Sequence, residues 1–184
     1  GVSAYPQDVT PAMVMNFLGG GAAINVLAKH AGAEIVILDA GVAADLPAHP
    51  SLRSVKIGRG TANISVGPAM TREQAIRCLE IGIETSQEQI ADGSDLLACG
   101  DMGIGNTTPS SAITSVITGA GTDVTTGRGT GLDDAGLAHK ASVVQRAIDL
   151  NHPDPKDGLD VLMKVGGFEI GVLAGVFLGA AAGH

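Results

Sequence analysis

Residues 95 to 111 read DLLACGDMGIGNTTPSS, an apolar run followed by a glycine-rich turn and then by residues that favour a helix. The apolar run DLLACG (95–100) has the length and composition of a strand buried in a parallel sheet. The following segment, TTPSSAITSVITG (107–119), is predicted to be a helix whose first turn accommodates Pro109. A strand, a tight turn and a helix in this order are typical of one unit of an α/β fold.

The same alternation continues on both sides of this unit. EIVILDAGV (34–42) and SVKIG (54–58) are predicted to be two further strands. Helices are expected where capping residues or apolar spacing indicate them: after Thr10 and Pro11, with Gly32 as C-cap, behind the capping pair Thr71 and Gln74, and along the stripe Leu137, Ala141, Val144 and Ile148. We therefore expect the α/β class, with a Rossmann-like parallel sheet, helices on both faces and three layers.

The composition excludes some classes of partner. The chain has 184 residues, a length that suits one well-cored domain, and a net charge of −8 with only 11 Lys and Arg. Nucleic acid is not an expected partner, because phosphate backbones are bound by clustered basic residues and bases by aromatic platforms. Cys78 and Cys99 show no metal-site spacing and are expected to be reduced thiols of a cytoplasmic protein.

The apolar segment 165–183 is the candidate for a membrane span. It contains Glu169, and glycine recurs at every fourth position from Gly167 to Gly183. Such a ridge lets another backbone approach closely, either in a membrane dimer or against a sheet in a soluble core, and the acidic composition favours the soluble core. The chain begins without Met and stops inside an alanine and glycine run, so we expect a fragment of a longer protein.

The loop GDMGIGNTT (100–108) could hold an anion, because exposed backbone N–H groups and a helix N-terminus would meet there. A tight turn without a ligand fits the loop equally well. A P-loop is excluded because no GK[ST] follows the last glycine, and the dinucleotide fingerprint fits only loosely and lacks its acidic partner. The five histidines form no metal-binding pair, so no metal site is expected.

Two charged residues are candidates for the site. Asp101 would repel a phosphate unless its carboxylate faces a sugar hydroxyl or a cationic ring, and a local turn contact is its simpler role. Lys140 flanks the apolar stripe of its helix and could reach the crevice beyond the strands. A solvated lysine is the alternative interpretation.

Six blocks stand in a fixed order along the chain: GVSAYPQDVT, MNFLGGGAAINVLAKHAGAE, GPAMTREQA, GDMGIGNTT, GRGTGLDDAGLAHK and GGFEIGVLAG. Together they resemble the nicotinate-nucleotide:dimethylbenzimidazole phosphoribosyltransferase family of cobalamin biosynthesis. The resemblance implies a glycosyltransferase reaction in which nicotinate mononucleotide gives its phosphoribosyl group to dimethylbenzimidazole. Nicotinate and α-ribazole phosphate are the products, with inversion at the anomeric carbon. It also implies a Rossmann-like large domain, a small domain made from both chain ends, a cytoplasmic homodimer, and neither cofactor nor metal.

The resemblance also implies roles for particular residues. Asp101 takes the place of a family glutamate and would be a supporting carboxylate in catalysis, one methylene shorter. Tyr5 matches a position beside the aromatic base, and Gly129 and Lys140 match positions around the 5′-phosphate. The other expected substrate contacts lie in one loop: Met102, Gly103, Gly105, Asn106, Thr107 and Thr108.

Members of this family are near twice as long as this chain. The resemblance places their general-base glutamate beyond His184, and an N-terminal segment before Gly1. We therefore expect residues 1–184 to be the central large-domain core, with the family's N-terminal and C-terminal segments absent and catalysis deficient. A non-catalytic nucleotide-binding or regulatory module of the same fold is the alternative. The acceptor base stays open, because related enzymes use purines or phenolics.

Overall fold

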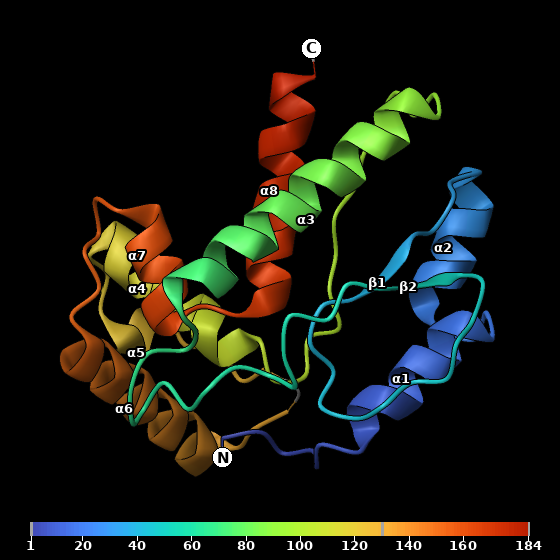
Figure 1. The fold of residues 1–184 in the computed structure, drawn as a ribbon. Coiled ribbons are helices and arrows are strands. Elements are labelled where there is room, and N and C mark those ends of the chain that lie inside the picture. Colours follow the sequence, from blue (N-terminus) through green and yellow to red (C-terminus); the bar gives the residue numbers. More distant parts are fainter. Residues whose placement is uncertain (1, 130, 184) are drawn as a thin grey trace.

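The computed structural model describes residues 2–129 and 131–183. Its helices are α1 (Val9–Leu18), α2 (Ala23–Ala31), α3 (Arg72–Ala91), α4 (Thr107–Thr118), α5 (Thr122–Thr125), α6 (Asp134–Asn151), α7 (Gly158–Val165) and α8 (Phe168–Ala182), and its strands are β1 (Ile37–Asp39) and β2 (Leu52–Ser54). In Figure 1 helices α4 to α7 gather on one side of the molecule and α1, α2 and the strands on the other. Helices α3 and α8 lie side by side between these two groups.

The helix signals of the sequence are largely confirmed. Thr71 and Gln74 form the expected capping box at the start of α3, with N···O distances of 2.9 and 3.2 Å. Pro109 lies in the first turn of α4, and Gly32 ends α2 in the left-handed conformation (φ 69°). The first helix begins at Val9 rather than at Thr10, and the glycines 19–21 divide the apolar stretch into two helices.

The strand predictions are only partly right. An α/β chain is confirmed, and β1 and β2 pair in parallel with Ile37 opposite Leu52. The second strand begins two residues earlier than predicted, although Val55 and Ile57 continue the bonding by donating to carbonyls of Asp39 and Ala40. These are the two strands that the described residues form, so a three-layer sheet is not seen.

The third predicted strand, residues 95–100, is wrong. The segment has no regular secondary structure in the described structure, and Leu96 is 87 % exposed. An apolar run becomes a strand only when a neighbouring strand takes up its backbone hydrogen bonds, and residues 95–100 form no such pairing among the described residues. The amino-acid composition of a segment does not show whether another strand pairs with it.

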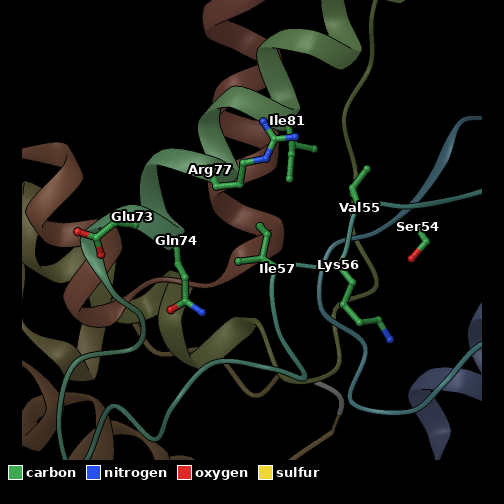
Figure 2. A pocket seen from close by; sticks show the side chains of 8 residues that line it. All are labelled: Ser54, Val55, Lys56, Ile57, Glu73, Gln74, Arg77 and Ile81. Carbon is green, nitrogen blue, oxygen red and sulfur yellow. The ribbon is translucent and has the colours of Figure 1, made fainter.

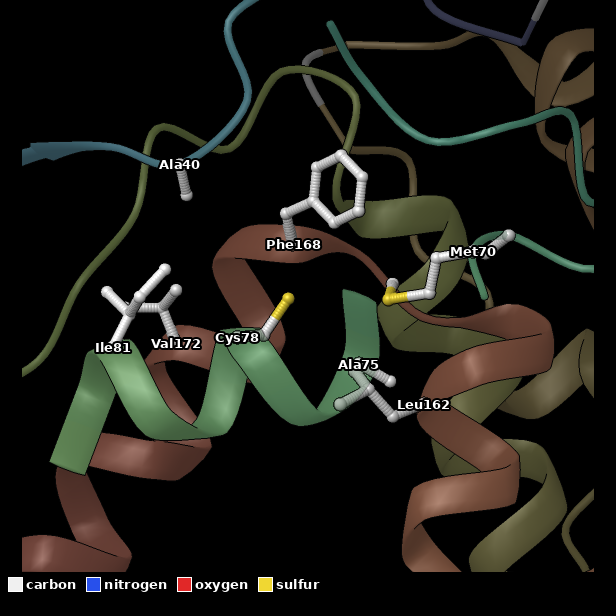
Figure 3. Packing of buried hydrophobic residues seen from close by; sticks show 9 residues of the cluster. Ala40, Met70, Ala75, Cys78, Ile81, Leu162, Phe168 and Val172 are labelled. Atoms are coloured by element: carbon white, nitrogen blue, oxygen red, sulfur yellow. The ribbon is translucent and has the colours of Figure 1, made fainter. Parts of the chain in front are cut away.

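Two hydrophobic clusters hold the helices together. The larger joins α3, α7 and α8 to the end of β1, with Phe168, Cys78 and Ile81 at its centre (Figure 3). The smaller joins α4, α6 and α7 through Ala112, Val144, Val161 and Val165. Helix α7 contributes to both clusters. It therefore joins helices α4 and α6 to the pair of helices α3 and α8.

The glycine ridge of α8 packs against a helix rather than a sheet. Gly171, Gly175 and Gly179 face α3, and Gly82 of α3 faces α8 in return. A Cβ atom on Gly82 would lie 2.0 Å from the carbonyl oxygen of Val172. The ridge therefore serves close packing inside the protein. The stretch Val9–Ala31 is long and apolar enough to cross a membrane by length and composition, but the break at glycines 19–21 interrupts it.

Candidate functional site

The loop 100–106 leads directly into the N-terminus of α4. Gly105 has φ +95°, a left-handed conformation that favours glycine, and Asn106 is the N-cap residue of α4. The Asn106 side chain is buried but does not cap the helix, and its Nδ2 atom has no hydrogen-bond partner. The free N–H groups of the first turn of α4 and this buried amide are thus available to a ligand.

Lys140 of α6 reaches this N-terminus. Its Nζ donates to Oγ1 of Thr107 at 2.8 Å and to the carbonyl oxygen of Gly127 at 3.1 Å. The residue is only 2 % exposed, and burial lowers the pKa of its ammonium group. The solvated-lysine interpretation of the sequence is therefore wrong.

Gly129 lies close to both Thr107 and Lys140. Its φ of +57° favours glycine, and a Cβ atom there would lie 3.1 Å from Thr107 Oγ1 and 3.2 Å from Lys140 Nζ. Thr107, Gly129 and Lys140 were expected in one site, and three different elements bring them together. We call this group, with Asn106 and Gly127, the lysine junction.

The lysine junction has the chemistry of an anion site. No carboxylate pairs with Lys140 in residues 2–129 and 131–183. Buried ammonium groups are normally paired, because removing an unpaired charge from water is costly. The positive end of the α4 dipole adds to the same potential. A bound anion would compensate both.

The remaining predicted residues lie along the same loop, with one exception. Met102 and Gly103 are half-buried, Thr108 is buried in the first turn of α4, and Asp101 is exposed at the beginning of the loop. Tyr5 lies on the segment before α1, where 47 % of its surface is exposed, and it is not part of the lysine junction.

Three residues near the site were missed by sequence reasoning. Glu169 lies in the first turn of α8, and burial followed by the charge of Asp101 raises the pKa of its carboxyl group. Thr125 and Thr126 have buried hydroxyl oxygens without a partner. Glu169 lies in the block GGFEIGVLAG and the threonines directly precede GRGTG. Only the tertiary structure brings Glu169 close to Asp101 and shows that the threonine hydroxyls are buried.

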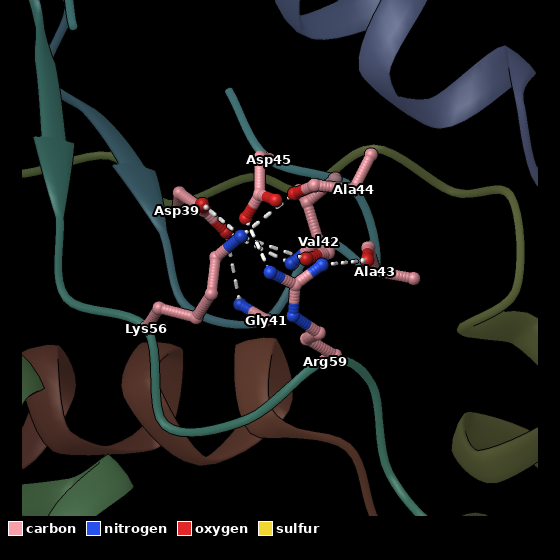
Figure 4. A network of polar contacts seen from close by, with 8 residues as sticks. All are labelled: Asp39, Gly41, Val42, Ala43, Ala44, Asp45, Lys56 and Arg59. Carbon is pink, nitrogen blue, oxygen red and sulfur yellow. Dashed lines mark hydrogen bonds and ion pairs between the residues drawn. The ribbon is translucent and has the colours of Figure 1, made fainter. Parts of the chain in front are cut away.

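A polar network fixes the loop that follows β1 (Figure 4). The buried Asp39 accepts hydrogen bonds from the N–H groups of Gly41 and Val42 and pairs with Lys56 at 3.1 Å. Lys56 also donates to the carbonyl oxygens of Val42 and Ala44. The ends of β1 and β2 are thereby joined, and Gly41 and Gly58 both contact the ring of Phe168 at the start of α8.

A surface groove lies away from the lysine junction. A groove of about 610 Å³ lies between the end of β2 and the first turns of α3 (Figure 2). Its lining has Lys56 on one side and Glu73 and Arg77 on the other. The Nζ atom of Lys56 already has three partners, which are the carbonyl oxygens of Val42 and Ala44 and the carboxylate of Asp39. No cluster of three potential metal ligands is found among the described residues.

Comparison with known proteins identifies the family. The family model DBI_PRT, described as Phosphoribosyltransferase, matches residues 1–184. The chain belongs to this phosphoribosyltransferase family. Curated relatives named nicotinate-nucleotide–dimethylbenzimidazole phosphoribosyltransferase include those of Roseiflexus castenholzii, 63 % identical over 182 residues, and Chloroflexus aggregans, 60 % identical over 182 residues. Each match covers 99 % of this chain and 52 % of the relative. The chain thus spans about half the length of these relatives.

A solved phosphoribosyltransferase structure has the same fold. The crystal structure of CobT from Thermus thermophilus superimposes with a TM-score of 0.93 at 48 % sequence identity. The match covers 100 % of this chain and 55 % of that one. At this identity the likeness extends to the family as well as to the fold.

Proposed function

We propose that this chain provides the phosphoribosyl-binding part of a nicotinate-nucleotide:dimethylbenzimidazole phosphoribosyltransferase. The single observation that carries the proposal is Lys140, a buried ammonium group without a carboxylate partner among the described residues, at the N-terminus of α4. The family membership and the names of the relatives support the assignment of the ligand. The 5′-phosphate of nicotinate mononucleotide would be the missing counter-charge.

The surrounding residues suit a sugar phosphate. The glycines at 103 and 105 leave the loop backbone open, and Gly129 keeps space beside Lys140 Nζ. With Thr107 and Thr108 in the first turn of α4, they would hold the phosphoribosyl group by backbone N–H groups and hydroxyls. Tyr5 and Met102 are proposed to contact the aromatic base.

The proposed reaction breaks the bond between the nicotinate ring nitrogen and the anomeric carbon and forms a new bond to a dimethylbenzimidazole nitrogen. Positive charge develops at the anomeric carbon in the transition state. Asp101, at the start of the loop that would hold the phosphate, would stabilise that charge as an electrostatic group. The dimethylbenzimidazole N–H proton passes to a general base, which the family resemblance assigns to a glutamate outside these 184 residues.

Further properties follow from the same resemblance. We propose that the chain is the central large-domain core of a cytoplasmic homodimeric enzyme, whose complete sheet is Rossmann-like with helices on both faces in three layers. Without the assigned general base, the chain would bind nicotinate mononucleotide but transfer its phosphoribosyl group slowly.

Binding and turnover measured on one preparation test this function. Isothermal titration with nicotinate mononucleotide should give saturable binding, which Lys140→Met weakens at least tenfold because the charge is lost while the volume is kept. Lys156→Met, at an exposed lysine in the loop before α7, is the matched control. Equal affinity of Lys140→Met and wild type would refute the proposed site. Transfer to dimethylbenzimidazole at the rate of a full-length relative would refute the deficiency, and binding without any transfer fits the regulatory-module alternative as well.

A further inference from the structure

Arg128, in the block GRGTG, has no role in the proposed site, although both of its neighbours in the chain touch Lys140. Gly127 gives its carbonyl oxygen to Lys140 Nζ at 3.1 Å. Gly129 lies so close that a Cβ atom there would be 3.2 Å from the same Nζ. Lys140 itself is only 2 % exposed. The conformation of the loop around Arg128 therefore decides how firmly the ammonium group is held and enclosed.

The side chain of Arg128 connects this loop to helix α6. Its Nη1 donates to the carbonyl oxygen of Leu132 at 3.0 Å, and its Nη2 donates to the carboxylate of Asp134 in the first turn of α6. The carbonyl oxygen of Arg128 also accepts hydrogen bonds from the N–H groups of Gly131 and Leu132, at 3.3 and 3.1 Å. Arg128 thus holds the loop against the helix that carries Lys140.

The loop needs such a side chain because its backbone has little stiffness of its own. Gly129 and Gly131 take left-handed conformations, with φ of +57° and +106°, and glycine loses more conformational freedom on folding than any other residue. Surface segments with few buried contacts open locally at a low free-energy cost. Arginine opposes this opening well, because its planar guanidinium group bonds two acceptors at once in a fixed geometry.

We propose that Arg128 is a positioning residue, which holds Gly127 and Gly129 against Lys140 and so keeps the ammonium group fixed at the N-terminus of α4. The inference rests on the proposed function for the task of Lys140. It goes beyond that function by assigning the arginine of the block GRGTG. Direct contact between Arg128 and the substrate is the competing role, and the two roles predict different results for Asp134.

Acetylation of lysines in the native protein tests the enclosure of Lys140 without any ligand. Acetic anhydride should modify Lys140 of wild type much more slowly than Lys156, an exposed lysine in the loop before α7. In Arg128→Ala the rate at Lys140, measured by mass spectrometry relative to Lys156, should rise roughly fivefold, because the loop opens more often. Arg128→Lys should restore part of the protection. The Tm should fall by no more than about 2 °C, since the lost bonds lie at the surface.

Binding of nicotinate mononucleotide to Arg128→Ala, Asp134→Ala and the double variant separates positioning from substrate contact. If Arg128 acts through Asp134, both single variants should weaken binding, Arg128→Ala by roughly fivefold, and the double variant should be no weaker than Arg128→Ala. If Arg128 contacts the substrate, its release from Asp134 should leave the affinity unchanged or raise it.

Arg146→Ala is the matched control, because Arg146 is an exposed arginine further along α6. This variant should keep the wild-type acetylation rate at Lys140 and the wild-type affinity for the nucleotide.

Three outcomes overturn the inference. They are an unchanged rate at Lys140 in Arg128→Ala, a rise in rate shared by every lysine, which would indicate global destabilisation, and additive losses of affinity in the double variant. Failure of wild type to bind nicotinate mononucleotide would refute the proposed function instead. The acetylation rates, which need no ligand, would then decide whether Arg128 holds the loop.

Discussion

Gly175 of α8 faces the backbone of Leu79 in α3 so closely that a Cβ atom on Gly175 would lie 2.1 Å from the Leu79 carbonyl oxygen. The obstacle is backbone, which cannot move aside as the end of a side chain can. The two helices are held in contact along the glycine ridge, and α3 and α8 form the middle of the molecule (Figure 1). The spacing of glycines along α8 is therefore a requirement of this helix crossing.

Gly175→Ala is expected to destabilise the chain by about 3 kcal/mol, because the added methyl group forces the helices apart. Thermal unfolding should show a fall in Tm of roughly 6–12 °C. Gly158→Ala is the control, since nothing lies within 4 Å of a Cβ atom at Gly158. Equal Tm values for Gly175→Ala and wild type would show that the crossing is looser than described.

Asp39 and Asp45 belong to the same polar network but should differ in their effect on stability (Figure 4). Asp39→Ala removes the acceptor of two half-buried N–H groups and the partner of Lys56, and should cost about 3–5 kcal/mol. Asp45 pairs with Arg59 at the surface, so Asp45→Ala should leave the unfolding midpoint in urea unchanged. A large effect of Asp45→Ala, or none of Asp39→Ala, would contradict the assigned roles.

Glu169 should make stability depend on pH. Burial, then the charge of Asp101, raises the pKa of its carboxyl group in the folded state above 4.5. The folded state then binds this proton more tightly than the unfolded state, so this group's contribution to stability falls as pH rises through the raised pKa. Glu169→Gln replaces the carboxyl group by a neutral amide, so the free-energy cost of ionising a buried carboxyl group in the folded state is removed. Its Tm should exceed that of wild type at pH 7, by roughly 1–3 °C, and the difference should vanish below pH 4.5.

The control for this prediction is Asp101→Asn, which removes one of the two causes of the raised pKa. It should reduce the pH dependence of the wild-type Tm in the same range. The same Tm difference between Glu169→Gln and wild type at pH 4 and pH 7 would show that ionisation of Glu169 costs nothing.

The two cysteines should react differently with iodoacetamide at pH 8. Burial, followed by the charge of Glu169, raises the pKa of the Cys78 thiol to about 12, and its side chain is enclosed between α3 and α8. Cys99 is half-buried, and burial raises its pKa as well. Mass spectrometry should find slow labelling at Cys99 and labelling of Cys78 only after unfolding in urea. Early labelling of Cys78 in the native protein would contradict its packing.

Sequence reasoning located α1, α3, α4 and α6 because their signals are local, but it predicted neither α5 nor α7. The capping box of Thr71 and Gln74 and the apolar stripe through Val144 depend on residues a few positions apart. Ordered blocks likewise identified the family, because many short matches in one order are specific together. The strand at 95–100 failed for the opposite reason, since a strand depends on a partner that lies elsewhere in the fold.

The sequence by itself determined the glycine-rich loop, the helix behind it and the family to which they belong. The tertiary structure decided that Lys140 is buried at the N-terminus of α4, where it bonds Thr107 and the carbonyl oxygen of Gly127. It also decided that the ridge of α8 packs on α3 rather than on a sheet. Burial, pairing of charges and close approach all depend on segments distant in sequence, so only the folded chain fixes them.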